Sequence, residues 1–196
     1  MARGVRVRIG VCMSVLGKCL VVCLMAVAGF FGAAAQAQTQ SHEEFFPEAD
    51  RFEALEEDEL PVTAAYADGE RIGLIFETVD IAPVPAYSGH PVNMHVALDR
   101  DGTVTGVSVI EHEEPIMLTG IPEHKLDEFI EQYIGKSIHD RVRVGISRRV
   151  REGYEYVDGL SGATVTVVVM GDTVMRAARQ AAIAHGFADA DEVDMR

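Results

Sequence analysis

The sequence predicts an α+β fold, in which a small antiparallel sheet packs against helices within a single domain. Two Asp-Gly pairs, Asp68-Gly69 and Asp101-Gly102, each separate two runs of alternating or β-branched residues. Such pairs favour β-hairpins, because glycine readily adopts the positive φ that a tight turn requires. Two further segments, 122–135 and 167–185, carry apolar residues at helical spacing. Hairpins combined with amphipathic helices are typical of an α+β domain.

The two hairpins account for the predicted sheet. Strands Val62–Ala67 and Ile72–Val79 are expected around the first turn, and strands Val92–Leu98 and Val104–Ile110 around the second. Between the hairpins, Ala82–Pro91 contains three prolines and a glycine, which predicts a loop.

The first helix is expected to begin near Pro122 and to end at Gly135, because these residues suit a first turn and a C-cap. Its apolar stripe consists of Leu126, Phe129, Ile130, Tyr133 and Ile134. Beyond it, the alternation of arginine and valine from Arg141 and the segment Gly153–Val157 predict further strands.

The final helix is predicted from about Val167 to His185, with Gly186 as its stop. Its apolar face is built from Val167, Met170, Val174, Met175, Ala178, Ala181 and Ala182. Plain core packing explains this face.

The chain is predicted to have four parts. Residues 1–37 resemble a signal peptide, 38–61 form an acidic leader, 62–187 form the domain and 188–196 form an acidic tail. The leader carries nine acidic residues between Glu43 and Glu59, so a solvated segment is expected. A short helix over about 49–57 is the alternative.

The export signal combines a basic start, an apolar run from Cys19 to Phe31 and an Ala-Gln-Ala cleavage site that ends at Ala37. The apolar run is short for a membrane span, which needs about 20 residues. We therefore expect cleavage and a periplasmic location. The remaining 159 of the 196 residues contain none of the three cysteines, so neither a disulfide nor a thiolate metal site is expected.

The charge of the mature chain excludes a nucleic-acid partner. Its 13 basic and 31 acidic residues give a net charge of −18, which repels phosphate backbones. The basic cluster consists of Arg141, Arg143, Arg148, Arg149 and Arg151. Pairing with nearby carboxylates is the simplest interpretation of these arginines. A docking patch or the rim of an anion site is the alternative, functional interpretation. The seven histidines are scattered, so no metal site is expected.

The segment from Asp158 to Thr166 is the candidate site. Two glycines, an alanine and three hydroxyl side chains precede the final helix, where free amide groups and the helix dipole stabilise an anion. A simple N-cap is one alternative. A serine nucleophile at Ser161 is another, since Gly159–Ala163 nearly matches a nucleophile elbow, but its last glycine is missing.

The same segment matches the pattern D-x-x-[ST]-G-A-[ST]-x-T and resembles the periplasmic, covalently flavinylated FMN-binding domains. Members of this family include the C subunit of sodium-pumping NADH:quinone reductase, the G subunit of the Rnf complex and the N-terminal domain of NosR. The Tyr87–Pro91 segment and the Glu111–Pro115 segment extend the resemblance, which spans about Phe45 to Gly186. Residues 116–120 replace the glycine-rich stretch of other members and make the chain look most like the NosR branch.

The resemblance implies roles for particular residues. Thr166 would carry FMN through a phosphoester, and the phosphate would be held by Asp158, Ser161, Gly162, Ala163 and Thr164. His112 and Glu114 would lie near the flavin, with Val165, Met117 and Leu118 shielding one face. In this family the expected partners are an FAD:protein FMN transferase and membrane-bound redox proteins.

The resemblance also implies an electron carrier without turnover of its own, which would support nitrous oxide reductase activity or maturation. Electrons are then expected to continue into another polypeptide. The rival from a different class is a non-redox interaction module that has the same fold and binds a partner through the leader or the arginine cluster. A serine hydrolase that uses Ser161 is a third alternative.

Overall fold

The computed structural model describes residues 42–55, 60–145 and 151–194. The predicted signal peptide lies outside the described residues, as do Arg148 and Arg149. The described residues belong to one compact unit that begins at His42.

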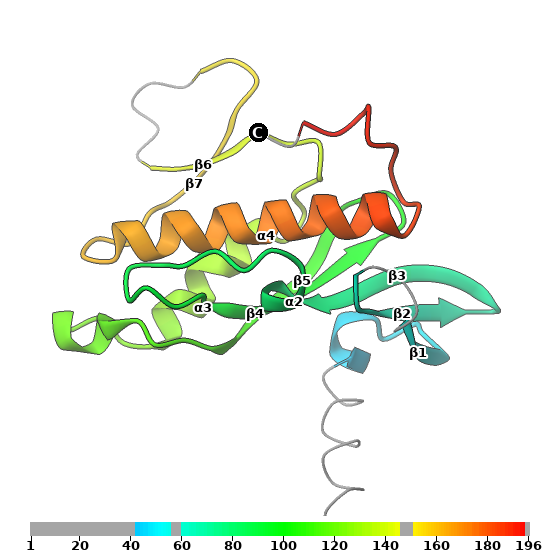
Figure 1. The fold of residues 1–196 in the computed structure, drawn as a ribbon, viewed down its shortest axis with the longest axis horizontal. Helices are drawn as coiled ribbons and strands as arrows, with labels where there is room; N and C mark the ends of the chain where they lie inside the picture. The colour runs from blue at the N-terminus through cyan, green and yellow to red at the C-terminus, as the bar shows by residue number, and fades with distance from the viewer. Residues whose placement is uncertain (1–41, 56–59, 146–150, 195–196) are drawn as a thin grey trace, which may run out of the picture. The chain divides into compact units, whose positions relative to one another are not determined.

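The main sheet is a five-stranded antiparallel meander in the order β1-β2-β3-β4-β5 (Figure 1). Its strands are β1 Arg51–Leu55, β2 Val62–Ala67, β3 Glu70–Glu77, β4 Asn93–Asp99 and β5 Val104–Glu111. Both predicted hairpins are confirmed, and with them the α+β class.

The first turn shows why the Asp-Gly signal was reliable. Asp68 has φ 52° and Gly69 has φ 82°, so both central residues adopt the left-handed conformation that a tight hairpin turn needs. The predicted second strand was too long, however, because Thr78–Ile81 form the short helix α2. There the buried Thr78 hydroxyl accepts a hydrogen bond from the Met94 amide at 3.0 Å and so replaces a ladder partner.

The acidic leader contains a strand where a helix was considered. Residues 51–55 pair with β2, so the helix over 49–57 is not formed. Before this strand, the rings of Phe45 and Phe46 pack against glycines of β5 and β3. A Cβ on Gly73 would come within 2.1 Å of the Phe46 ring, and one on Gly106 within 2.3 Å of the Phe45 ring. The glycines thus leave room for the aromatic rings, and Phe46 is buried.

The helix predicted near Pro122 is shorter than expected. Helix α3 spans His124–Ile130 and continues as the 3₁₀ turn η2 over Glu131–Tyr133. Ile134 follows in an extended conformation and is 47% exposed, so its predicted place in the buried stripe was wrong. The tighter 3₁₀ turn moves it away from the face of the helix.

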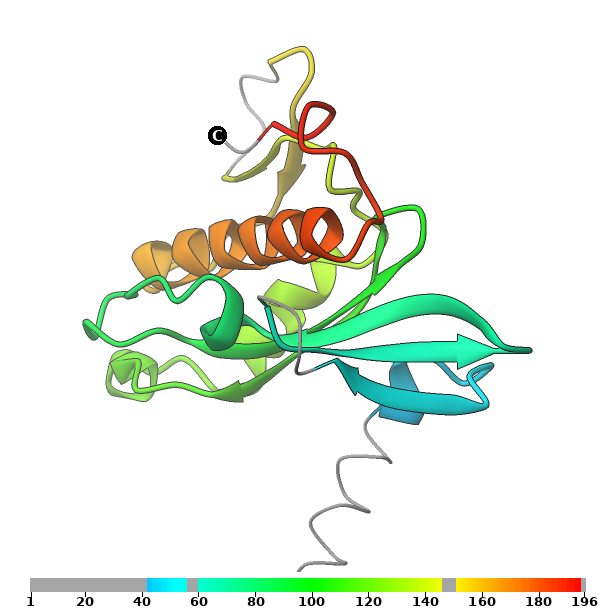
Figure 2. The ribbon, with the colours of Figure 1, turned by 45° about the vertical axis from the view of Figure 1, so that its right-hand side comes forward.

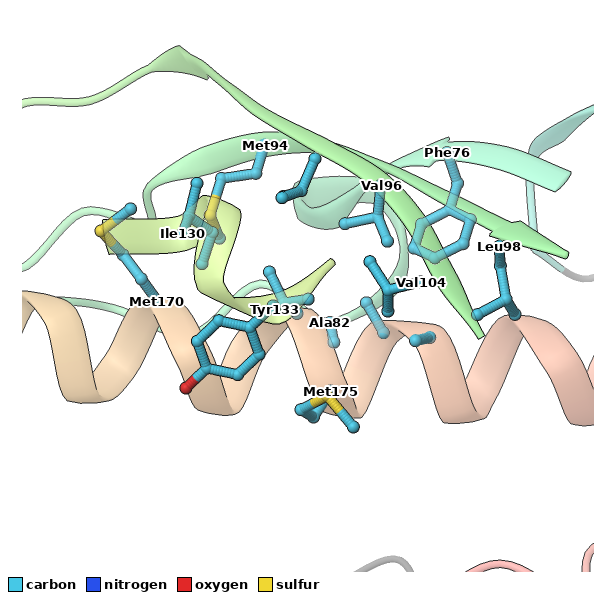
Figure 3. Close-up of a cluster of buried hydrophobic side chains, with 14 of the residues drawn as sticks. Phe76, Ala82, Met94, Val96, Leu98, Val104, Ile130, Tyr133, Met170 and Met175 are labelled. Carbon is cyan, nitrogen blue, oxygen red and sulfur yellow. The ribbon is translucent and has the colours of Figure 1, made fainter. Parts of the chain in front are cut away.

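The long helix α4 spans Thr164–Ala184 and begins three residues earlier than predicted. In both views it lies between the five-stranded sheet and a small parallel pair, β6 Val142–Val144 and β7 Glu155–Val157 (Figures 1 and 2). The core fills the space between the sheet and α4. Figure 3 shows Phe76, Val96 and Leu98 pointing from the sheet toward the helix.

Candidate functional site

A buried hydroxyl–carboxylate pair lies at the start of α4. The Thr166 hydroxyl donates a hydrogen bond to Oε2 of Glu114, a residue 52 positions earlier in the chain. Thr166 is 3% exposed and Glu114 is 5% exposed. Thr166 occupies the first turn of α4, and Glu114 directly precedes the 3₁₀ turn η1, Pro115–Thr119. The fold therefore brings together two residues that the sequence had singled out separately.

The other oxygen of Glu114 is also held. The backbone amide of Ser88 donates to Oε1 at 2.7 Å. Burial alone would raise the pKa of the Glu114 carboxyl, but hydrogen bonds from Thr166 and Ser88 outweigh it and hold that pKa below its usual value. Glu114 is therefore a carboxylate at neutral pH, with each oxygen accepting one of these hydrogen bonds.

His112 accepts a hydrogen bond from the backbone of Glu114. Its Nδ1 accepts a hydrogen bond from the Glu114 amide at 3.1 Å, which places the proton of a neutral ring on Nε2. Nε2 lies 3.5 Å from Oε1 of Glu123. His112 lines a different hollow, between β5 and α3, and is absent from the set that surrounds Thr166. His112 is therefore connected to Thr166 through Glu114, and its place near a flavin stays a prediction.

A hollow of about 330 Å³ opens beside Thr166. Its walls are formed by Tyr87, Pro115, Ile116, Thr119 and residues 162–166. This volume lies at the lower end of ligand pockets, which measure roughly 300–1,000 Å³. Tyr87 and Val165 are 68% and 53% exposed, so apolar surface continues to the rim. Leu118, which was also expected to shield a flavin, is 89% exposed and does not line the hollow.

The start of α4 is suited to an anion. Ala163 occupies the N-cap position and has no side-chain oxygen, so the simple capping interpretation of this segment is wrong. The first amide groups of a helix lack partners within the helix and carry the positive end of its dipole. Gly162 has φ 90°, and a Cβ there would lie 3.2 Å from Cδ1 of Ile121. Gly162, Ala163 and Thr164 thus border the hollow with Thr166, as a phosphate-binding loop would.

Two predicted phosphate ligands, Asp158 and Ser161, lie outside the lining of the hollow. Asp158 is tied to η2, because its amide donates to the Gln132 side chain at 2.8 Å and its carbonyl accepts from that side chain at 3.1 Å. Ser161 is exposed, and neither residue lines the hollow. Within the described part of the chain, the Ser161 hydroxyl is bonded to neither a histidine nor a carboxylate, which removes the support for a serine hydrolase.

Sequence reasoning missed Tyr87, Ser88, Ile116 and Thr119 as site residues. Tyr87 and Ser88 stand in a segment that carried the family resemblance, but nothing local indicates that they face residue 166. Only the loop before β4 and the η1 turn, folded against α4, place them there.

The described residues contain neither a cluster of three or more metal-ligating side chains nor a helix long and apolar enough to cross a membrane. Of the arginine cluster, Arg141 and Arg143 line a larger hollow between α4 and the β6–β7 pair, and Thr166 is not part of that lining. There Arg141 pairs with Asp194 at 2.5 Å and Arg143 stacks over the Tyr154 ring at 4.6 Å. The pairing interpretation is confirmed for Arg141.

Residues 87–179 match the FMN-binding domain family. The chain is 40% identical over 154 residues to the regulatory protein NosR of Stutzerimonas stutzeri, covering 79% of this chain and 21% of NosR. It is 28% identical over 118 residues to the G subunit of the ion-translocating oxidoreductase complex of Aliivibrio fischeri, covering 60% of this chain and 53% of that protein. A solved structure, NqrC of Shewanella oneidensis, aligns with a TM-score of 0.40 at 21% identity, over 68% of this chain and 65% of that chain.

The chain spans about a fifth of the length of NosR. Every residue that lines the hollow beside Thr166 lies within the matched segment. The uncapped helix start, the glycine beside it and the apolar rim fit a flavin whose phosphate lies at the helix start. Residues 87–179 of this chain therefore belong to the FMN-binding domain family.

Proposed function

We propose that this chain is an electron-carrying flavoprotein of the periplasm, with FMN attached through a phosphoester to Thr166. The observation that supports attachment is the position of the Thr166 hydroxyl. Thr166 belongs to the lining of the hollow, and it lies in the first turn of a helix whose N-cap residue makes no side-chain hydrogen bond. An oxygen at this position would join the phosphate directly to the site where helix amide groups stabilise it.

Covalent attachment suits an exported carrier. A flavin that dissociated outside the cytoplasm would be lost by dilution, whereas a phosphoester retains it. When bound, FMN supplies one- and two-electron chemistry, and the protein contributes orientation and a polar or apolar environment. Here the apolar rim would cover part of the ring system, and the helix start would hold the phosphate.

The partners follow from this proposal. An FAD:protein FMN transferase would load the domain, and membrane-bound redox proteins would exchange electrons with it. The relationship to NosR supports a role in nitrous oxide reduction, and the relationship to a component of an ion-translocating oxidoreductase complex supports electron transfer.

The test is to co-express the full chain with an FMN transferase and then denature the purified protein. Flavin fluorescence that stays with the polypeptide, together with a mass increase equal to an FMN phosphoester, is expected for the wild type. Thr166→Ala should lose both signals completely. Ser161→Ala, which removes a nearby exposed hydroxyl, should keep them. An unmodified wild-type chain beside an active transferase would rule out the proposal.

A further inference from the structure

We propose that Glu114 is the general base that activates Thr166 for flavin attachment, so that the acceptor domain supplies part of the chemistry of its own modification. This inference rests on the proposed phosphoester at Thr166. A threonine hydroxyl is a weak nucleophile at its ordinary pKa and is activated by an adjacent base. The Thr166 hydroxyl already donates its proton toward Oε2 of Glu114.

Glu114 is arranged so that one of its oxygens is dedicated to Thr166. The Ser88 amide holds Oε1 at 2.7 Å, and the Glu114 amide is itself anchored on His112 at 3.1 Å. The Ser88 contact holds the carboxylate and the His112 contact holds the Glu114 backbone, while Oε2 accepts from Oγ1 of Thr166. Because both residues are buried, water does not compete strongly for the hydroxyl proton.

The step balances with FAD as the co-reactant. Oγ1 of Thr166 attacks the phosphorus on the FMN side of the pyrophosphate, and an Oγ1–P bond forms. The bond from that phosphorus to the bridging oxygen breaks, and AMP leaves with that oxygen and its electron pair. The hydroxyl proton passes to Oε2 of Glu114. Nothing is oxidised or reduced.

The charges favour this transfer as it proceeds. A pyrophosphate that approaches the hollow places negative charge beside Glu114, which disfavours the carboxylate and increases its proton affinity. Loss of the Thr166 proton also removes one of the hydrogen bonds that stabilise the carboxylate. A protonated Glu114 can then donate to a phosphate oxygen, so two buried negative charges are not left side by side.

The alternative is that Glu114 only orients Thr166 and that the transferase supplies the base. Glu114→Gln separates the two possibilities, because glutamine keeps the shape and an acceptor oxygen but cannot take a proton at neutral pH. The full chain, purified without flavin, is mixed with transferase and FAD, and the FMN mass increase is followed over time at several pH values. Thermal unfolding of each variant checks its fold.

We expect Glu114→Gln to slow attachment by about 10²–10⁴-fold, the usual contribution of a general base. The wild-type rate should fall on the acid side as Glu114 is protonated, and the variant should lack that acid limb. A folded Glu114→Gln chain that is modified at the wild-type rate overturns the inference but leaves the phosphoester intact. A wild-type chain that is never modified contradicts the proposed function instead.

If Glu114→Gln does not fold, Glu114→Asp decides the question. Aspartate keeps a carboxylate but withdraws it from Thr166 by one methylene. We expect slower attachment with the acid limb retained. Attachment of Glu114→Asp at the wild-type rate would show that contact between the carboxylate and Oγ1 is not needed, and would overturn the inference.

Discussion

The two hollows beside α4 differ in size and in what their polar groups are bonded to. The larger, about 680 Å³, is lined by Arg141, Arg143 and Arg179 and by the acidic residues Asp172 and Asp194. The smaller, about 330 Å³, is lined mainly by apolar and hydroxyl side chains, and no residue of its lining is charged. Both lie against the same helix, and α4 residues on both fall within the segment that matches the FMN-binding family.

The polar groups at the two hollows differ in the partners to which they are bonded. In the larger hollow the guanidinium of Arg179 donates to the Ile138 carbonyl at 2.8 Å and to the Asp140 carbonyl at 2.6 Å, and Arg141 pairs with Asp194. The Arg179 contacts tie residues 138–140 to α4, and the Arg141 pair ties the residue before β6 to the C-terminal segment. At the smaller hollow, Thr166 of the lining donates its hydroxyl to the buried carboxylate of Glu114, a residue outside the lining, at the start of a helix whose N-cap side chain makes no hydrogen bond. Volume alone therefore does not locate the chemistry.

The largest effect on stability is expected from Thr166→Val in the smaller hollow. Valine keeps the shape of threonine but removes the hydroxyl, which leaves Oε2 of Glu114 buried without this donor. A loss of about 1–3 kcal/mol in the free energy of unfolding is expected. Urea denaturation measures it. Thr164→Val, the same change at an exposed position two residues earlier, should stay within about 0.5 kcal/mol. Equal losses in the two variants would show that the hydrogen bond between Thr166 and Glu114 does not contribute to stability.

Gly162→Ala should cost somewhat less stability but should also slow flavin attachment. Alanine is strained by about 1–2 kcal/mol in a left-handed conformation, and its Cβ would press on Ile121. Gly153→Ala is the matched control, because Gly153 has φ 81° with nothing within 4 Å of a Cβ. Both variants should lose stability in urea, and only Gly162→Ala should slow the mass increase. Slowing in both would remove the distinction between the two regions.

The acid stability of the chain should depend on Glu114. Its pKa is lowered in the folded state, so the unfolded chain binds more protons on the acid side. The stabilisation is present above the unfolded pKa of about 4.3 and is lost as the pH falls through the folded value. Urea midpoints measured over this range should fall more steeply for the wild type than for Glu114→Gln. Parallel curves would mean that burial cancels the hydrogen bonds.

The smallest effect is expected from Arg141→Met in the larger hollow. Its side chain is 52% exposed and that of Asp194 is 33% exposed, so solvent screens their ion pair. The expected loss is about 0–1 kcal/mol, with flavin attachment unchanged. A large loss of attached flavin in this variant would move the site toward the arginine cluster and reverse the comparison.

Local signals predicted much of the fold. Each Asp-Gly pair favours a backbone conformation that few other residues adopt easily, so both hairpins could be placed from the sequence alone. The apolar stripe of α4 was equally clear, and only its start was misplaced, by three residues. Strand β1 was missed, because its short sequence within the acidic leader is stabilised as a strand by pairing with the edge of β2, which no local pattern reveals.

The sequence by itself determined the hairpins, the long helix and Thr166 as the residue of interest. Only the tertiary structure decided which neighbours Thr166 has. It placed Glu114 and the Ser88 amide beside it, turned His112 toward Glu123, and left Asp158 and Ser161 outside the hollow. The physical reason is the distance along the chain between the residues that interact. Turns and helix faces depend on residues a few positions apart, whereas a hydrogen bond across 52 residues exists only after the sheet, η1 and α4 have packed.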